Sequence, residues 1–238
     1  MTDPRPVGPT LRNWAPPPRP DSTLTLEGRY ARLVALNAEA HAALLFNAYD
    51  GHDWVWDYMP VGPFASAAQF HRWMREAAAG DDPLFFAIHD TERDRWGGFA
   101  SYLRIKPASG AIEVGFIAMA PALQRTRAAT EAMYLMMRWA FEAGYRRYEW
   151  KCDALNRPSR RAAQRLGFSF EGIFRQATVV KGRNRDTAWF SVIDTEWPAL
   201  SEAFRLWLDP ANFNATGQQH EALSDLTRLV RAADDPDL

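Results

Sequence analysis

The order of strand-like and helix-like hydrophobic patterns along the chain limits the possible fold more than any other feature of the sequence. Strand-like runs occupy residues 84–89, 96–105 and 111–118, and the turn-forming segments 90–94 and 107–110 join them. Connections this short link antiparallel neighbours. After Pro121 the period becomes helical until Gly144, and residues 145–152 alternate again, which predicts a strand–helix–strand crossover. The chain is therefore predicted to be α+β with a mixed, mostly antiparallel central sheet and flanking helices.

The remaining elements follow from the same signals and from capping residues. Asn37 can cap the start of one helix, and Gly80 can end the next one. We expect an opening hairpin over 24–36, helices over 39–46, 66–79 and 158–166, a loop over 53–64, and a closing hairpin from 172–180 and 187–193. A C-terminal helical extension is expected over 196–208 and 218–231.

Length and composition favour one main core. The chain has 238 residues, 47% hydrophobic and 24% charged, as in ordinary globular proteins. Prolines crowd the first 23 residues and predict an extended arm or a disordered tail rather than a helix. The expected organisation is a Pro-rich arm over 1–23, an α+β domain over 24–198 and the helical extension over 199–238.

The overall charge and the single cysteine exclude several classes of function. The net charge of −1 gives no general attraction to nucleic acid or to an anionic membrane. Cys152 is alone, and no cluster of Cys and His has metal-ligand spacing, so neither an internal disulfide nor a metal is expected. No apolar run is long enough to cross a membrane, and the N-terminus lacks signal-peptide features. A cytoplasmic location is the expectation.

The segment 118–131 carries the first chemical signal. A strand ends there, small and basic residues follow, and a helix begins. Backbone amides at such a helix start, together with Arg125 or Arg127, would form a local pyrophosphate site. An arginine-bearing surface loop fits the same residues equally well.

Two motifs resemble those of a known family. Residues 124–129, Gln-Arg-Thr-Arg-Ala-Ala, resemble the Q/R-x-x-G-x-G/A coenzyme A loop of the GNAT superfamily, with Arg127 at the first Gly position and Ala129 at the last. Residues 149–172 resemble the RimJ/RimL-like pattern of a strand, N-x-x-S, a short helix, L-G-F and E-G. On these motifs the chain is identified as a member of the GNAT superfamily, near the RimJ/RimL-like branch. The resemblance covers about residues 24–198 and implies a three-layer αβα fold.

The resemblance implies a donor site for an acyl-coenzyme A, most simply acetyl-CoA. Splayed-strand amides and the coenzyme A loop would form it, with Asn156 contacting pantetheine or capping its helix. The implied donor-binding residues are Phe116, Ile117, Ala118, Gln124, Arg125, Thr126, Arg127, Ala128, Ala129, Thr130, Asn156 and Ser159.

The reaction requires a base for the amine, donors for the oxyanion and an acid for the leaving thiolate, and no covalent enzyme intermediate. Glu113, on the strand that enters the cleft, is the candidate base, although a solvated strand position is an equal alternative. Ser159 matches the Ser of N-x-x-S, the implied acid, and could equally be an ordinary helix-start hydroxyl next to Pro158. Thr178 stands where RimL-like enzymes have a candidate Glu, so the identity of the base stays open.

The aromatic segment 54–59 is the candidate acceptor wall, because related enzymes hold their substrate in this region; core packing is the alternative. Asp53 and Asp57 would attract a cationic amine. The candidate acceptor-binding residues are Trp54, Trp56, Asp57 and Tyr58.

The implied activity is acetyl transfer to a primary amine, either a protein N-terminal amine or a small amine. A succinyl-CoA or other acyl-CoA transferase is an alternative within the same class, and a noncatalytic acyl-CoA-binding regulatory module is an alternative outside it. The expected partners are the acyl-CoA and the amine acceptor, with neither nucleic acid nor a membrane. The sequence does not decide between a monomer and a homodimer.

Overall fold

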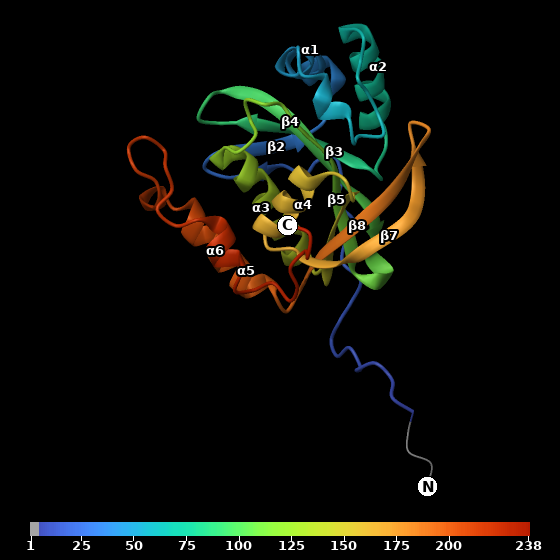
Figure 1. Ribbon diagram of the computed structural model, residues 1–238, viewed down its shortest axis with the longest axis vertical. Coiled ribbons are helices and arrows are strands. Elements are labelled where there is room, and N and C mark those ends of the chain that lie inside the picture. The colour runs from blue at the N-terminus through green and yellow to red at the C-terminus, as the bar shows by residue number, and fades with distance from the viewer. Residues whose placement is uncertain (1–4) are drawn as a thin grey trace.

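An eight-stranded sheet forms the frame of the protein in a computed structural model that describes residues 5–238 (Figure 1). The strand order is β1-β2-β3-β4-β5-β6-β8-β7, and every neighbouring pair is antiparallel except β5 and β6. The predicted mixed, mostly antiparallel sheet is confirmed. The strands are β1 Leu26–Glu27, β2 Ala31–Ala35, β3 Leu84–Asp90, β4 Arg95–Lys106, β5 Ala111–Met119, β6 Arg147–Asp153, β7 Ser169–Val180 and β8 Arg183–Ile193.

The helices begin where capping residues allow. The side chains of Asn37 and Ser66 accept hydrogen bonds from backbone amides of the first turns of α1 and α2, and Thr126 does the same for α3. The α-helices are α1 Ala38–Ala48, α2 Ala67–Ala78, α3 Arg127–Glu142, α4 Arg157–Arg165, α5 Trp197–Leu208 and α6 Leu223–Thr227. Short 3₁₀ turns are η1 Asp53–Trp56, η2 Pro107–Ser109 and η3 Pro210–Asn212.

Two hydrophobic cores lie on opposite faces of the sheet, which gives the three layers. On one face α1, α2 and η1 pack an aromatic cluster against β3 and β4, with Phe70 and Phe99 fully buried. On the other face α3, α4 and α5 cover the sheet, and Tyr134 and Phe204 join α3 to α5 with ring centroids 5.1 Å apart. Figure 1 shows α1 and α2 at one end of the view and α5 and α6 at the opposite side, beyond α3.

Two of the expected elements differ in the structure. The segment 53–64, expected as a loop, contains the 3₁₀ turn η1. The helix expected over 218–231 is wrong, because only the five residues of α6 are helical. The side chain of Asn212 holds the carbonyls of Trp207 and Glu221, and the chain after α6 bonds to α4 and β7. These contacts satisfy the polar groups that a longer helix would have satisfied internally.

The proline-rich arm contains no helix or strand between residues 5 and 25. Its second half nevertheless lies against the body of the protein. Arg19 donates to the carbonyl of Ile105 over 3.0 Å, and the Tyr145 hydroxyl donates to the carbonyl of Pro18 over 3.0 Å. These bonds tie residues 18 and 19 to the end of β4 and the start of β6.

None of the helices between residues 5 and 238 combines the length and hydropathy needed to span a bilayer.

Candidate active site

The two parallel strands separate part of the way along β5. Their pairing starts at Ala111 with Arg147 and ends at Val114 with Trp150. Beyond this point Gly115–Met119 has no partner in β6. The separated strands therefore leave an opening in the middle of the sheet, between the two helical layers.

A β-bulge lies at the point of separation. Ser101 pairs with Gly115 and Phe99 with Ala118, so Phe116 and Ile117 on β5 stand opposite one residue of β4. Phe116 has a φ of 48°, which a non-glycine residue rarely adopts. Gly98 lets β4 pass close to the bulge, because a Cβ there would lie 2.5 Å from the carbonyl oxygen of Ala118. The bulge turns this part of β5 out of the regular ladder and places Phe116, Ile117 and Ala118 at the opening.

The turn from β5 to α3 presents unpaired backbone amides. The amide of Ala129 is capped by the hydroxyl of Thr126, but the amides of Arg125, Arg127 and Ala128 bond to no other atom between residues 5 and 238. Arg125 has a φ of 61° and an exposed side chain without an ion pair within the same range. Unpaired amides at the start of a 16-residue helix, beside the exposed guanidinium of Arg125, are groups that can hold an anion.

The side chain of Arg127 points away from these amides. Its guanidinium pairs with both carboxylate oxygens of Glu92, at 2.5 and 3.2 Å, and lies over the rings of Tyr30 and Phe213, at 4.7 and 4.8 Å from their centroids. Arg127 is the first residue of α3 and its φ is not positive, so the backbone there does not require glycine. The structure thus accommodates this departure from the family loop.

The start of α4 lies at the end of β6. Asn156 caps the helix by accepting from the amide of Ser159 over 3.1 Å. The Ser159 hydroxyl oxygen accepts from the indole N–H of Trp150 over 3.0 Å. That bond uses an acceptor position of the hydroxyl, and the same side chain also hydrogen-bonds to the thiol of Cys152. Trp150, which fixes the hydroxyl, was not singled out in the sequence.

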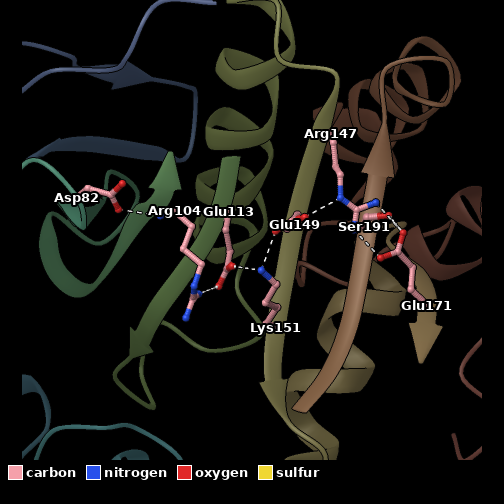
Figure 2. A network of polar contacts seen from close by, with 8 residues as sticks. All are labelled: Asp82, Arg104, Glu113, Arg147, Glu149, Lys151, Glu171 and Ser191. Carbon is pink, nitrogen blue, oxygen red and sulfur yellow. Dashed lines mark hydrogen bonds and ion pairs between the residues drawn. The ribbon is translucent and has the colours of Figure 1, made fainter. Parts of the chain in front are cut away.

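Glu113 is not a solvated strand residue. It is 2% exposed, and its two carboxylate oxygens accept from Arg104 over 2.5 Å and from Lys151 over 2.7 Å (Figure 2). Asp82 holds the amides of Arg104 and Ile105 at 2.7 and 3.0 Å, which fixes the strand segment that carries Arg104. Sequence reasoning missed Arg104 and Lys151, because they meet Glu113 only when β4 and β6 flank β5.

Glu113 and its two cationic partners, Arg104 and Lys151, belong to a row of alternating charges across the sheet (Figure 2). Lys151 also donates to Glu149 over 2.7 Å and lies 3.8 Å from the ring centre of Trp189. Arg147 bridges Glu149 and Glu171. Burial would raise the pKa of Glu149, but the hydrogen bonds from Arg147 and Lys151 outweigh it and lower that pKa. The row runs from Arg104 on β4 to Glu171 on β7 in the order Arg104, Glu113, Lys151, Glu149, Arg147 and Glu171.

The segment after α1 borders the opening through two contacts. Tyr58 donates to the carbonyl of Leu155, in the turn before α4, over 3.3 Å. Lys181, at the tip of the β7–β8 hairpin, donates to the carbonyl of Trp56 over 2.8 Å. Trp54, Asp57 and Tyr58 are exposed, whereas the Trp56 side chain is 3% exposed and packs in the aromatic cluster.

Two of the four arginines on α4, Arg160 and Arg165, are engaged within the protein. Arg160 is buried in an ion pair with Asp235 and also pairs with Asp237. Arg165 bonds to the hydroxyl of Thr130 over 3.1 Å and lies over the ring of Trp207. Burial lowers the pKa of Arg165. Arg157 and Arg161 are exposed.

Cys152 is a buried thiol, as expected for a strand residue. Its side chain is 6% exposed, and burial raises its pKa from 9.0 to about 11. We expect the native protein to resist a thiol reagent such as dithionitrobenzoate at pH 8, and the protein unfolded in guanidinium to react with one equivalent. Rapid release of one equivalent from the native protein would contradict this assignment.

Among residues 5–238 no three His, Cys, Asp or Glu side chains form a metal cluster.

The separated parallel strands, the unpaired amides at the start of α3 and the capped start of α4 lie on an α+β fold with one mixed sheet between two helical layers. The family model described as "Acetyltransferase (GNAT) domain" matches residues 32–169. The chain therefore belongs to the GNAT acetyltransferase family and is an enzyme of that type. Members of this family use acetyl-CoA as the acyl donor.

Solved structures agree with the family model. A GCN5-related N-acetyltransferase from Brucella melitensis is 49% identical over 92% of this chain and 100% of that chain, with a TM-score of 0.89. A probable GNAT-family acetyltransferase from Chromobacterium violaceum is 41% identical over 84% of this chain and 100% of that chain, with a TM-score of 0.77.

A more distant structure shares the fold. It is an acetyl transferase from Salmonella typhimurium described as modifying the N-terminal serine of ribosomal protein L7/L12. It is 19% identical over 70% of this chain and 96% of that chain, with a TM-score of 0.59. A comparison with curated protein sequences gives no match.

Proposed function

We propose that the protein transfers an acetyl group from acetyl-CoA to a primary amine by direct attack of the amine on the thioester. The observation that carries this proposal is the combination of an opening between β5 and β6 with unpaired amides at the start of α3. The amides at the start of α3 can hold the anionic end of the donor, and the opening between β5 and β6 can hold its thioester. Acetyl-CoA with a mixed panel of amines and peptides tests it, since the proposal requires acceptor-dependent release of free thiol.

Each end of the donor has proposed contacts. The amides of Arg125, Arg127 and Ala128 would bind the pyrophosphate, and the bulged residues Phe116, Ile117 and Ala118 would line the thioester. Gln124 holds the loop by donating to the carbonyl of Met119 over 2.9 Å. Thr126, Ala129 and Thr130 belong to the capped first turn. Asn156 and Ser159 would face the pantetheine arm and the sulfur.

The two arginines of the loop are expected to differ. Arg125→Ala should weaken acetyl-CoA binding about fivefold, because it removes an unpaired cation beside the free amides. Arg127→Ala should change binding less and lower the melting temperature instead, because Arg127 is committed to Glu92, Tyr30 and Phe213. Calorimetric titration of both variants in low and moderate salt checks this order. Unchanged binding in Arg125→Ala would remove it from the donor site.

The proton transfers are assigned to Glu113 and Ser159. Both oxygens of Glu113 already accept from cations and the side chain is buried, so we place a water between this carboxylate and the amine. The hydroxyl proton of Ser159 would turn from the thiol of Cys152 to the leaving thiolate as the carbon–sulfur bond breaks. The amine proton passes through the water to Glu113, and Glu113 then releases it to solvent while solvent returns a proton to Ser159, which restores both side chains.

Of the four candidate residues Trp54, Trp56, Asp57 and Tyr58, Trp56 is buried in the aromatic cluster, and we place the acceptor against the other three. Three of these side chains are exposed next to the turn before α4, and the backbone of the same segment contacts the β7–β8 hairpin tip. The Salmonella enzyme with the same fold acts on a protein N-terminus, which supports a RimJ/RimL-like acceptor of that kind. A small amine, or a succinyl donor, is the competing substrate. A ratio of thiol release with peptides to that with free amines distinguishes the acceptors.

A further inference from the structure

A pocket of about 250 Å³ opens between the end of α1, the turn η1 and the start of α2. It is distinct from the opening between β5 and β6. Its walls and floor are aromatic, and its rim carries two carboxylates. The lining residues are Phe46, Tyr49, Asp50, Gly51, Asp53, Trp56, Phe64, Ala65 and Phe70.

The aromatic lining is held rigidly. Phe64 meets Trp56 edge to face with ring centroids 5.2 Å apart and an angle of 89°, and meets Phe70 at 5.0 Å. Tyr49 meets Trp56 at 5.0 Å and donates its hydroxyl to the carbonyl of Ala118 over 2.8 Å. Tyr49, Trp56 and Phe70 are buried, so a ligand would find the floor already formed.

Two features make the rim negative, the carboxylates of Asp50 and Asp53 and the end of helix α1. Asp50 and Asp53 are exposed, and their carboxylates make no ion pair or hydrogen bond with any side chain or amide between residues 5 and 238. Helix α1 ends at Ala48 without a basic residue in its last turn, so the partial negative charge of that helix end is not offset. Lys181 is held at the carbonyl of Trp56 and pairs with neither carboxylate.

We propose that this pocket binds an organic cation, specifically an alkylammonium group. Aromatic rings attract a cation through their negative faces, and the rim carboxylates add a coulombic attraction that the exposed position only partly screens. A neutral group of the same shape would gain the apolar contact alone. A metal ion fits less well, because two carboxylates above aromatic rings offer too few oxygen ligands. The pocket shares Trp56 with the segment proposed as the acceptor wall, and Asp53 was expected to attract the acceptor amine, so a cation bound here would lie beside that wall. Its binding is nevertheless measurable without acyl transfer.

The test compares two probes of the same shape, choline and its neutral isostere 3,3-dimethylbutan-1-ol, in the absence of acyl-CoA. Saturation-transfer NMR on the methyl signals gives both dissociation constants. We expect choline to bind at least about fivefold more tightly than the alcohol. Equal affinities, or no choline signal at large excess, would overturn the proposal.

Variants locate the binding. The double variant Asp50→Asn with Asp53→Asn should lose most of the preference for choline, and Phe64→Leu should weaken choline more than the alcohol. The matched control is Glu76→Gln with Asp81→Asn, which removes two exposed charges near the same helical layer but outside the pocket. If the control loses as much as the pocket variant, the attraction is general and the site is wrong. All four carboxylates are exposed, so folding is not at issue.

Discussion

Replacing Asp235 by alanine is expected to lower the free energy of unfolding by about 3 kcal/mol, near the low end for breaking a buried ion pair. Asp235 is 3% exposed and Arg160 is 4% exposed. Two hydrogen bonds of 2.6 and 2.5 Å join them. The variant leaves a buried guanidinium whose remaining partners among residues 5–238 are Asp237 and the carbonyl of Ala154.

The neighbouring carboxylate supplies a matched control. Asp234 is 60% exposed, and its partner Arg231, whose side chain is 5% exposed, also donates to the carbonyl of Gln164 and the hydroxyl of Thr227. Asp234→Ala should therefore cost about 1 kcal/mol, less than Asp235→Ala. Urea unfolding of both variants measures the difference. The paired replacement Arg160→Met with Asp235→Leu should recover part of the loss, because neither charge is then left alone. Equal costs for Asp234→Ala and Asp235→Ala would mean that the tail is not held by this pair.

The variant Asp235→Ala should also weaken the donor site. Arg160 follows Ser159 directly and also holds the carbonyl of Ala154, in the turn that leads into α4. Loosening Arg160 therefore loosens the helix start that carries Asn156 and Ser159. A rise in the KM for acetyl-CoA is expected well below the melting temperature of the variant.

Glu113→Gln is expected to lower kcat by about 10²- to 10⁴-fold, the range for losing a general base, while acetyl-CoA binding is retained. Glutamine keeps the shape of the side chain but cannot take up the proton of the attacking amine. Thiol release at several pH values and calorimetric titration of the donor measure the two effects.

Glu149→Gln separates this role from a structural one. Glu149 is the register partner of Glu113 on β6 and accepts from the same Lys151 over the same 2.7 Å. If Glu113 serves only to neutralise Lys151, both variants should lose activity equally. A loss confined to Glu113→Gln supports the base, and full activity in Glu113→Gln removes the assignment.

Local sequence signals predicted the elements that depend on short-range physics. Helices α1 and α2 start at Asn37 and Ser66, whose side chains cap the first turn, and the strands of the central sheet follow their alternation. The tail after α6 was predicted as helix and is not, because its groups bond to α4 and β7 rather than to each other. Residue spacing alone does not show whether these groups bond within a helix or to other elements.

The candidate site divides in the same way. The coenzyme A loop at 124–129 and the N-x-x-S of α4 were recognisable, because the motif residues are consecutive or nearly so. The partners of Glu113 were not, since Arg104 and Lys151 come from β4 and β6 and reach it only across the sheet. The side-chain direction of Arg127 depends likewise on Glu92 and on Phe213, 86 residues further along the chain.

The sequence by itself determined the order of helices and strands, the mixed sheet and the family of the chain, because periodicity, caps and short motifs act over a few residues. Only the tertiary structure decided what each charge does. It buried Glu113 between two cations, locked Arg160 onto the tail and left Asp50 and Asp53 unpaired above an aromatic pocket. The physical reason is that burial and charge pairing depend on residues brought together from distant parts of the chain, which no local pattern specifies.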